Sequence, residues 1–213
     1  MNIDKISCLV FDLDDTLYPH SSGVWLKIRD RITRYLQDVM GFPETEVDAL
    51  RSRLWSQYGT TLRGLQAEYE VDMTEYLAYV HDIPLEHFLA PDPTLDHILS
   101  QLPWRKVIFT NSDTNHANQV LSQLGINRHF ERIVDIHAIA PYCKPQTAAF
   151  DKALPLIGDE PGRCLLVDDS PANLDTARSL GMQTVSVGER NHDGSPHIET
   201  VHGLYDLLVG QHN

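Results

Sequence analysis

Three aspartates stand close together near the start of the chain, in the stretch VFDLDDTLYP (residues 10–19). Asp12, Asp14 and Asp15 come directly after an apolar run, and a threonine follows them. Carboxylates this close repel one another unless a positive charge lies among them. Carboxylates without Cys or His at ligand spacing favour a hard divalent cation, most simply Mg²⁺. We therefore expect a magnesium ion at this stretch.

Further polar groups follow other apolar runs; they are Thr110, Asn111, Lys144, Asp168 and Asp169. In an open parallel sheet, chemistry gathers at the carboxyl ends of the strands, so all these groups can meet at one edge. Residues two apart in a strand share a face, so Asp12 and Asp14 can point into the same cavity. Asp168 and Asp169 point in opposite directions, so at most one binds the metal directly and the other acts through water or a hydrogen bond to a ligand.

The elements that must position these groups alternate along the chain. β-rich apolar runs lie at residues 5–13, 105–110, 132–136, 163–168 and 183–187. Helical patterns lie between them at residues 114–126, 147–158 and 170–182, the first ending near Gly125 and the last beginning with Ser170 as N-cap and Pro171. Continuously apolar strands that alternate with helices predict a doubly wound (Rossmann-like) α/β fold around a parallel sheet.

Residues 19–90 break this alternation, because every pattern in them is helical. Residues 21–40 predict one long amphipathic helix, and shorter helical patterns follow at residues 44–59, 61–69 and 73–83. We therefore expect an α/β core domain formed by residues 1–18 and 91–213, with an all-helical cap domain, residues 19–90, inserted after the first strand.

One cap segment, YGTTLRGL (residues 58–65), has two possible roles. It is either an ordinary turn between helices or a loop that hangs over the active site. We favour the loop, which makes Thr61 and Arg63 candidate substrate contacts.

The composition limits the classes of binding partner. The chain has 213 residues, is 42% hydrophobic and carries a net charge of -13, which argues against nucleic acid or an anionic membrane as a partner. The sequence shows neither a membrane span nor a signal peptide. Cys8, Cys143 and Cys164 form no CxxC motif and predict free thiols in a cytoplasmic protein, with Cys8 and Cys164 as core packing. The sequence leaves monomer and homodimer equally open.

The ordered motifs DLDDT, TN, K and DD resemble those of haloacid dehalogenase superfamily phosphatases. The resemblance implies that Asp12 attacks phosphorus to form an aspartyl-phosphate, while Asp14 protonates the leaving group and later activates water. It implies that the phosphoryl group is bound by Thr110, Asn111 and Lys144. It also implies a Mg²⁺ site formed by Asp12, the backbone carbonyl of Asp14, and Asp169, with Asp168 beside it.

Two expectations accompany this mechanism. Asp14 must be protonated when the alcohol leaves, so we expect its surroundings to raise its pKa toward the working pH. Asn173, shortly after Asp168 and Asp169, is either helix surface or a supporting polar group.

The expected substrate is a small phosphorylated metabolite, because helical caps in this position close over small molecules in this superfamily. The stretches FDLDDTLYPHSSGVW, GTTLRGL and VDDSPANL resemble the pyrimidine 5'-nucleotidase branch, which implies UMP or CMP as substrate.

Several alternatives stay open or are disfavoured. A phosphatase of a sugar or flavin phosphate, a phosphomutase, and a non-catalytic phosphate-binding regulatory module remain possible readings of the same motifs. Haloacid dehalogenases lack the second acid that Asp14 supplies here. A receiver domain places its phosphorylated aspartate after the third strand, whereas Asp135 lies within the corresponding run.

Overall fold

A parallel sheet forms the centre of the computed structural model, which describes residues 2–188 and 196–210. The six strands have the order β3-β2-β1-β4-β5-β6, and every neighbouring pair is parallel. They are β1 (Cys8–Phe11), β2 (Arg105–Phe109), β3 (Arg132–Val134), β4 (Cys164–Asp168), β5 (Gln183–Val187) and β6 (His197–Ile198). The predicted doubly wound α/β fold is confirmed. The strand β6 was not predicted, because two residues are too few to show a pattern.

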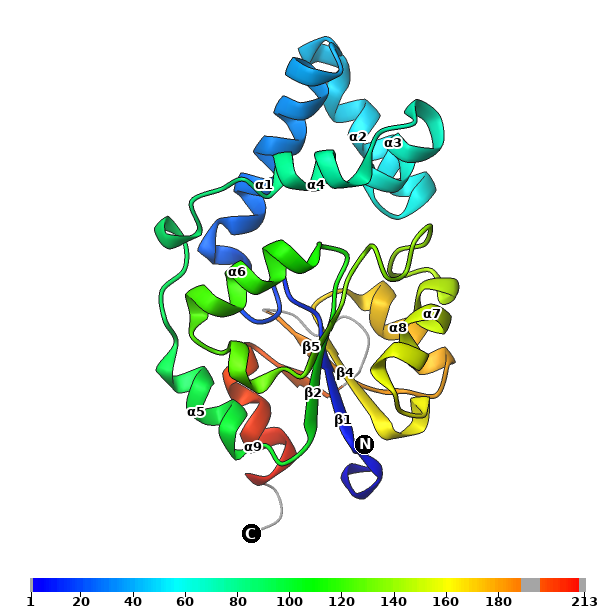
Figure 1. Cartoon of the computed structure of the whole chain (residues 1–213). Coiled ribbons are helices and arrows are strands. Elements are labelled where there is room, and N and C mark those ends of the chain that lie inside the picture. Colours follow the sequence, from blue (N-terminus) through cyan, green and yellow to red (C-terminus); the bar gives the residue numbers. More distant parts are fainter. Residues whose placement is uncertain (1, 189–195, 211–213) are drawn as a thin grey trace.

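Helices cover both faces of the sheet (Figure 1). One face carries α5 (Pro93–Gln101), α6 (Thr114–Leu124) and α9 (Leu204–Leu208), and the other carries α7 (Thr147–Ile157) and α8 (Pro171–Ser179).

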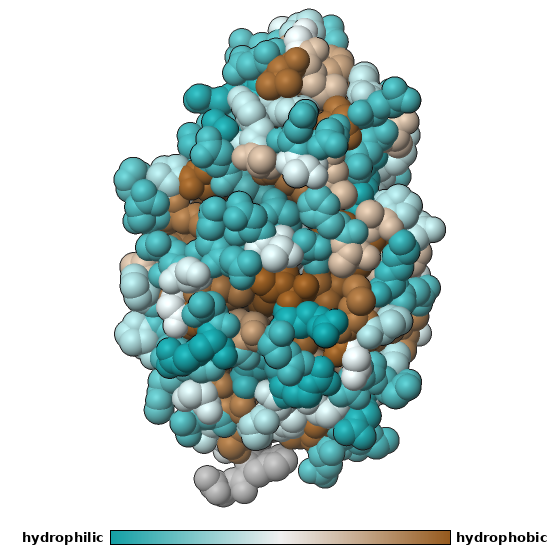
Figure 2. Space-filling view, in the orientation of Figure 1, coloured by the Kyte–Doolittle hydropathy of each residue, from teal (hydrophilic) through white to brown (hydrophobic). Residues whose placement is uncertain are grey.

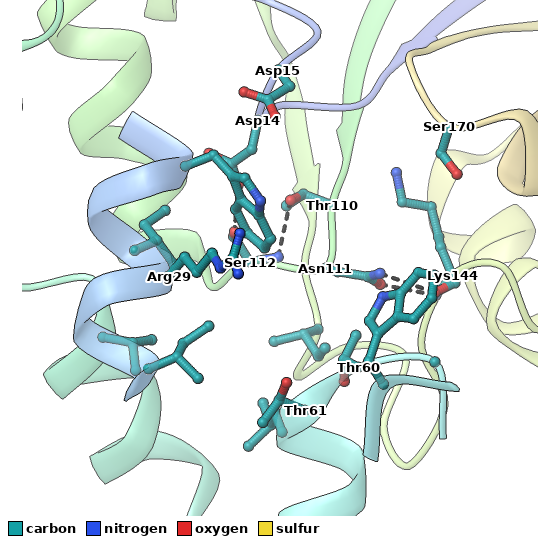
Figure 3. A pocket seen from close by; sticks show the side chains of 18 of the residues that line it. Asp14, Asp15, Arg29, Thr60, Thr61, Thr110, Asn111, Ser112, Lys144 and Ser170 are labelled. Atoms are coloured by element: carbon teal, nitrogen blue, oxygen red, sulfur yellow. Dashed lines mark hydrogen bonds between the residues drawn. The ribbon is translucent and has the colours of Figure 1, made fainter. Parts of the chain in front are cut away.

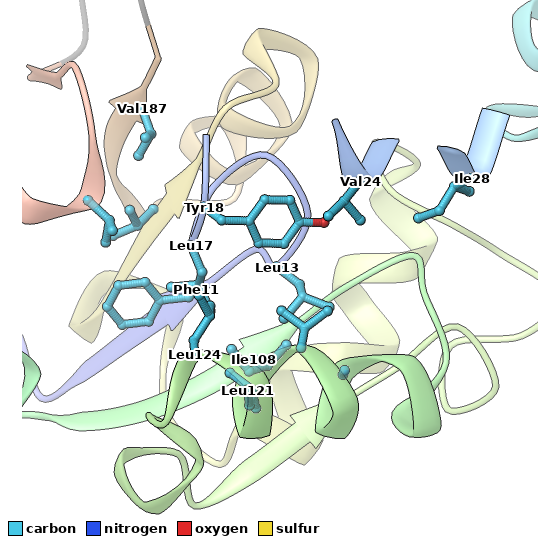
Figure 4. Packing of buried hydrophobic residues seen from close by; sticks show 14 of the residues in the cluster. Phe11, Leu13, Leu17, Tyr18, Val24, Ile28, Ile108, Leu121, Leu124 and Val187 are labelled. Atoms are coloured by element: carbon cyan, nitrogen blue, oxygen red, sulfur yellow. The ribbon is translucent and has the colours of Figure 1, made fainter. Parts of the chain in front are cut away.

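Strand β1 is continuously apolar because both of its faces are buried. Leu9 and Phe11 belong to the core cluster beneath the first group of helices, whereas Cys8 and Val10 belong to the cluster beneath the second group. Figure 4 shows Phe11 in its cluster, close to Leu124 of α6. A strand covered on both faces needs an apolar side chain at every position.

An all-helical segment lies between β1 and α5, above the carboxyl ends of the strands (Figure 1). It contains α1 (Val24–Arg34), α2 (Glu44–Tyr58), α3 (Thr61–Tyr69) and α4 (Met73–Val80). The single helix predicted for residues 21–40 begins only at Val24 and continues from α1 into a π-helical segment, Tyr35–Val39. We call this segment the cap; its exact domain limits, at residues 19 and 90, stay a prediction.

Three further features concern the surface, the helices and the cysteines. Hydrophilic residues cover most of the face shown in Figure 2. Within the described residues, no helix combines the length and apolar character needed to cross a membrane. All three cysteines are buried and free, and Cys8 and Cys164 pack in the core beneath α7 and α8.

A glycine in the cap generates the first prediction. A Cβ on Gly64 of α3 would lie 2.7 Å from Leu54 Cβ on α2, closer than packed atoms tolerate. Gly64→Ala therefore lowers the free energy of unfolding by about 1–3 kcal/mol through overpacking, although alanine is the better helix former. Urea unfolding followed by tryptophan fluorescence measures this. Gly162→Ala is the control, since a Cβ there meets nothing within 4 Å. A Gly64 variant as stable as the wild type would contradict this close packing.

Candidate active site

The candidate site lies where the strand order reverses, since the chain leaves the central strand β1 for β2 on one side and later crosses to β4 on the other. Ligands in doubly wound folds bind at such a point, outside the carboxyl ends of the strands. Asp12 follows β1, and its backbone N–H donates to the Val167 carbonyl of β4, at 2.9 Å. Asp168 ends β4. The sequence-predicted residues that line the resulting pocket are Asp12, Asp14, Thr61, Thr110, Asn111, Lys144, Asp169 and Asn173.

Lys144 is the buried cation of this site. It is only 2% exposed, and its Nζ donates to Asp12 Oδ1 at 2.8 Å and to Asp168 Oδ2 at 2.9 Å. Asp168 is fully buried and also accepts hydrogen bonds from Asn173 Nδ2 and the Ser170 backbone N–H. The ammonium group therefore holds together the acids that end two neighbouring strands. Of the two roles considered for Asn173, helix surface and supporting polar group, the structure shows the second.

The acids crowd one another, and their pKa values show it. One oxygen each of Asp12, Asp168 and Asp169 lie within 4.8 Å of one another. Burial, together with the charges of Asp168 and Asp169, raises the pKa of Asp12 well above its usual range despite Lys144. Burial and the charge of Asp168 raise the pKa of Asp169 to about 7. Because carboxylate oxygens are the ligands that Mg²⁺ prefers, this donor set fits a magnesium ion, whose charge would offset the repulsion.

Asp14 differs from our expectation. Three side chains hydrogen-bond its carboxylate: Tyr18 OH at 2.5 Å, Ser112 Oγ at 2.6 Å and His116 Nε2 at 2.9 Å. Burial alone would raise its pKa, but the charge of His116 and these hydrogen bonds outweigh burial and hold the pKa of Asp14 well below its usual range. The expected raised pKa is therefore wrong for this arrangement, because the neighbours stabilise the ionised form.

None of these three partners of Asp14 was predicted from the sequence. Tyr18 follows the acidic stretch, Ser112 lies two residues after Thr110, and His116 lies in the first turn of α6. Only proximity to the motifs could have singled out Tyr18 and Ser112. His116 was hidden by the helical pattern, which predicts an ordinary helix residue at that position.

Thr110 and Asn111 lie beside each other but use their polar atoms differently. The Thr110 Oγ1 accepts the Ser112 N–H at 3.0 Å, and the hydroxyl lines the pocket (Figure 3). The Asn111 side chain instead exchanges two hydrogen bonds with the Lys144 backbone: Nδ2 donates to its carbonyl and Oδ1 accepts its N–H. This amide therefore fixes the loop that carries Lys144.

Thr61 lines the pocket, whereas Arg63 connects the cap to the core. The Arg63 guanidinium is buried and donates to the backbone carbonyls of Ile136 at 2.8 Å and Tyr142 at 2.7 Å. These carbonyls belong to the loop before Lys144. The structure thus corrects our expectation that Arg63 touches substrate, because its donors are engaged with core carbonyls and with Gln66 of the cap.

The cap supplies the far end of a pocket of about 980 Å³. Trp25, Arg29, Arg51 and Trp55 line it from the cap. In Figure 3, the Arg29 guanidinium points from α1 toward Ser112. The charge of Arg29 contributes to lowering the pKa of the partly buried Arg51, after the larger effect of burial. The cap end of the pocket is therefore aromatic and positively charged, in a chain whose net charge is negative.

Comparison with known proteins gives the class. Residues 6–181 match the family model of haloacid dehalogenase-like hydrolases, and the chain belongs to this family. A phosphate metabolism protein of Saccharomyces cerevisiae is 30% identical over 81% of this chain, and the match spans 58% of the yeast protein's length. A phosphoglycolate phosphatase of Cereibacter sphaeroides is 25% identical over 92% of each chain.

Solved structures show the same fold. A phosphatase of this family from Thermococcus onnurineus matches with a TM-score of 0.63 and 21% identity, over 96% of this chain and 99% of its own. The L-2-haloacid dehalogenase of Xanthobacter autotrophicus matches with the same TM-score and coverage at 14% identity. At these identities, the likeness concerns the fold alone.

The connection made by Arg63 generates the second prediction. Arg63→Met leaves the buried Ile136 carbonyl and the partly buried Tyr142 carbonyl without their donor, so we expect the free energy of unfolding to fall by about 2 kcal/mol or more. Arg53→Met is the control, because Arg53 makes an exposed ion pair with Glu68 on the cap surface, and we expect little change from it. Urea unfolding of both variants measures the difference. Equal stability of the two variants would contradict the role given to Arg63.

Proposed function

We propose that this chain is a Mg²⁺-dependent phosphomonoesterase that acts through an aspartyl-phosphate on Asp12. The observation that supports this most directly is the placement of Asp12, which lies between the Lys144 ammonium and the acidic cluster with Asp169. Lys144 keeps one Asp12 oxygen fixed, and the other can face a phosphate in the pocket. Mg²⁺ held by Asp12, Asp169 and the Asp14 carbonyl would offset the repulsion between a carboxylate and an anionic phosphate.

The reaction divides into two displacements at phosphorus. First, an Asp12 oxygen forms a bond to phosphorus while the bond to the ester oxygen breaks, and Asp14 gives that oxygen a proton. Then water attacks phosphorus, Asp14 takes the water's proton, and the Asp12–phosphorus bond breaks to release phosphate. Thr110 and Lys144 would bind the phosphoryl oxygens in both steps.

The three donors around Asp14 stabilise its ionised form. The ionised form is the one that accepts a proton in the second step. The first step needs the protonated form. The negative charge of a bound phosphate beside Asp14 would raise its pKa, so substrate binding itself would favour the acid.

For the substrate, we propose a pyrimidine nucleoside 5'-monophosphate, UMP or CMP. Trp25 and Trp55 offer indole faces on which a base could stack. Arg29 makes no hydrogen bond or ion pair with residues 2–188 or 196–210, so its donors are available for the carbonyl oxygen of a pyrimidine. A nucleotide would also make fuller use of a pocket of about 980 Å³ than a two-carbon acid would.

A second candidate is a phosphoglycolate phosphatase. Several relatives carry that name, and the free Arg29 guanidinium could equally bind a carboxylate. The two candidates differ in what they require of the tryptophans, since only a base would stack on them.

Catalysis by Asp12 is the third prediction. Asp12→Asn removes the nucleophile, so we expect hydrolysis of p-nitrophenyl phosphate with Mg²⁺ to fall by roughly 10³-fold or more. Removing divalent ions from the wild type with a chelator has a similar effect, and added Mg²⁺ restores activity. Asp175→Asn, an exposed residue on α8, is the matched control. Equal turnover by wild type and Asp12→Asn would rule out the aspartyl-phosphate.

Substrate choice is the fourth prediction. Among UMP, CMP, AMP, phosphoglycolate, a sugar phosphate and flavin mononucleotide, we expect the highest kcat/KM for UMP and CMP. Arg29→Met raises KM for UMP by roughly tenfold or more, because a charged hydrogen bond is lost. Arg34→Met, on the same helix but outside the pocket, is the control. A preference for phosphoglycolate, with little effect of Trp25→Ala, would favour the second candidate instead.

A further inference from the structure

Two histidines stack on each other where the cap meets the core. His81 directly follows α4 of the cap as its C-cap residue, and His116 lies in the first turn of α6 of the core. Their ring centroids are 4.2 Å apart, with an angle of 20° between the planes. His116 is fully buried and His81 is 8% exposed.

Asp113 links the two histidines. Its Oδ2 lies 2.8 Å from His81 Nδ1, and its Oδ1 accepts the His116 backbone N–H at 2.8 Å as the N-cap of α6. The stacking, the His81–Asp113 hydrogen bond and the N-cap hydrogen bond of α6 together fix the plane of the His116 ring.

The fixed ring points at the second aspartate of the site. His116 Nε2 lies 2.9 Å from Asp14 Oδ1, and His116 Nδ1 is buried without a hydrogen-bond partner among the described residues. A histidine retained only for packing could be replaced by an apolar side chain, which would remove that unpartnered nitrogen. The polar atom that justifies a histidine here is therefore Nε2, whose N–H donates to Asp14.

We propose that His116 is a positioning residue for Asp14, and that His81, by stacking on it, makes this positioning depend on the cap being in place. The inference rests on the proposed function, because it concerns the residue to which proton transfer is assigned there. Two other side chains also donate hydrogen bonds to Asp14. They are Tyr18, near the start of the chain, and Ser112, on the core loop after β2. Of the three donors, His116 is the one whose ring stacks on an aromatic side chain of the cap, that of His81.

Two phosphate esters of similar shape distinguish the loss of Asp14 positioning from a general loss of activity. Benzyl phosphate releases an alkoxide that needs a proton, whereas p-nitrophenyl phosphate releases a stable phenolate that does not. Because kcat/KM reports the steps up to departure of the alcohol, it isolates the proton donation. Losing the His116 donor raises the pKa of Asp14, which by itself would favour the acid, so a net loss reports a misplaced carboxyl group. We expect His116→Leu to lower kcat/KM for benzyl phosphate by roughly 10²-fold or more and for p-nitrophenyl phosphate by less than about tenfold.

The conservative variant tests the hydrogen bond itself. Gln Nε2 can reach the same place as His Nε2, so His116→Gln recovers most of the benzyl phosphate activity that His116→Leu loses. His129→Leu is the matched control, since it removes a half-buried histidine that pairs with Asp96 away from the site. The stability of each variant is measured by urea unfolding, and equal stability of the Gln and Leu variants excludes unfolding as the cause of their difference.

A double-mutant cycle tests the contribution of the cap. His81→Ala alone lowers kcat/KM for benzyl phosphate by roughly tenfold, but it has little further effect when added to His116→Leu, because the two act through the same hydrogen bond. Equal losses on both esters, no recovery with Gln, or additive effects in the cycle would overturn the inference while leaving the phosphatase assignment intact. A wild type inactive on both esters would instead contradict the proposed function.

Discussion

The buried ammonium group of Lys144, set between Asp12 and Asp168, is the interaction on which the site depends. Two carboxylates at the ends of neighbouring strands would repel each other in a poorly hydrated pocket. With Lys144 between them at 2.8 and 2.9 Å, they are held in one arrangement. Removing a single partner from such a group leaves an uncompensated buried charge, which is strongly destabilising. The charge balance that orients Asp12 therefore also stabilises this edge of the sheet.

The loop that carries Lys144 is held from two sides. Asn111, after β2, binds the Lys144 backbone, and Arg63, from the cap, binds the carbonyls of Ile136 and Tyr142 earlier in the loop. A further contact between cap and core, the stacked histidines, lies beside Asp14. The cap thus contacts the core beside Asp14 and on the loop that leads to Lys144, the partner of Asp12, so its position is physically connected to the groups assigned to the chemistry.

The sequence predicts the layout of the fold because the signals are local and repeated. Continuous apolar runs identified five strands, glycine and proline marked helix ends, and the break in alternation located the cap. β6 was missed because it has only two residues, and the start of α1 at Val24 was missed because the polar residues 21–23 before it carry no periodic signal.

The polar groups at strand ends were predictable for the same reason, whereas their partners were not. The parallel topology brings Asp12, Thr110 and Asp168 to one edge, and a pattern can reveal that. The charge state of Asp14 depends on Tyr18, Ser112 and His116, which meet only in three dimensions. The charged side chain of Arg63 similarly suggested a substrate contact. In the folded chain, however, its buried guanidinium binds the backbone carbonyls that lie beside it.

The most direct test of the central claim is mass spectrometry of protein quenched in acid during turnover with Mg²⁺ and a phosphate ester. Asp14→Asn should be used beside the wild type, because slower release of phosphate would let the intermediate accumulate. We predict a phosphoryl group on Asp12 of the wild type and of Asp14→Asn, and none on any residue of the Asp12→Asn variant. Steady turnover with Asp12 unmodified in both wild type and Asp14→Asn, or with the phosphoryl group on another side chain, would contradict the role given to Asp12.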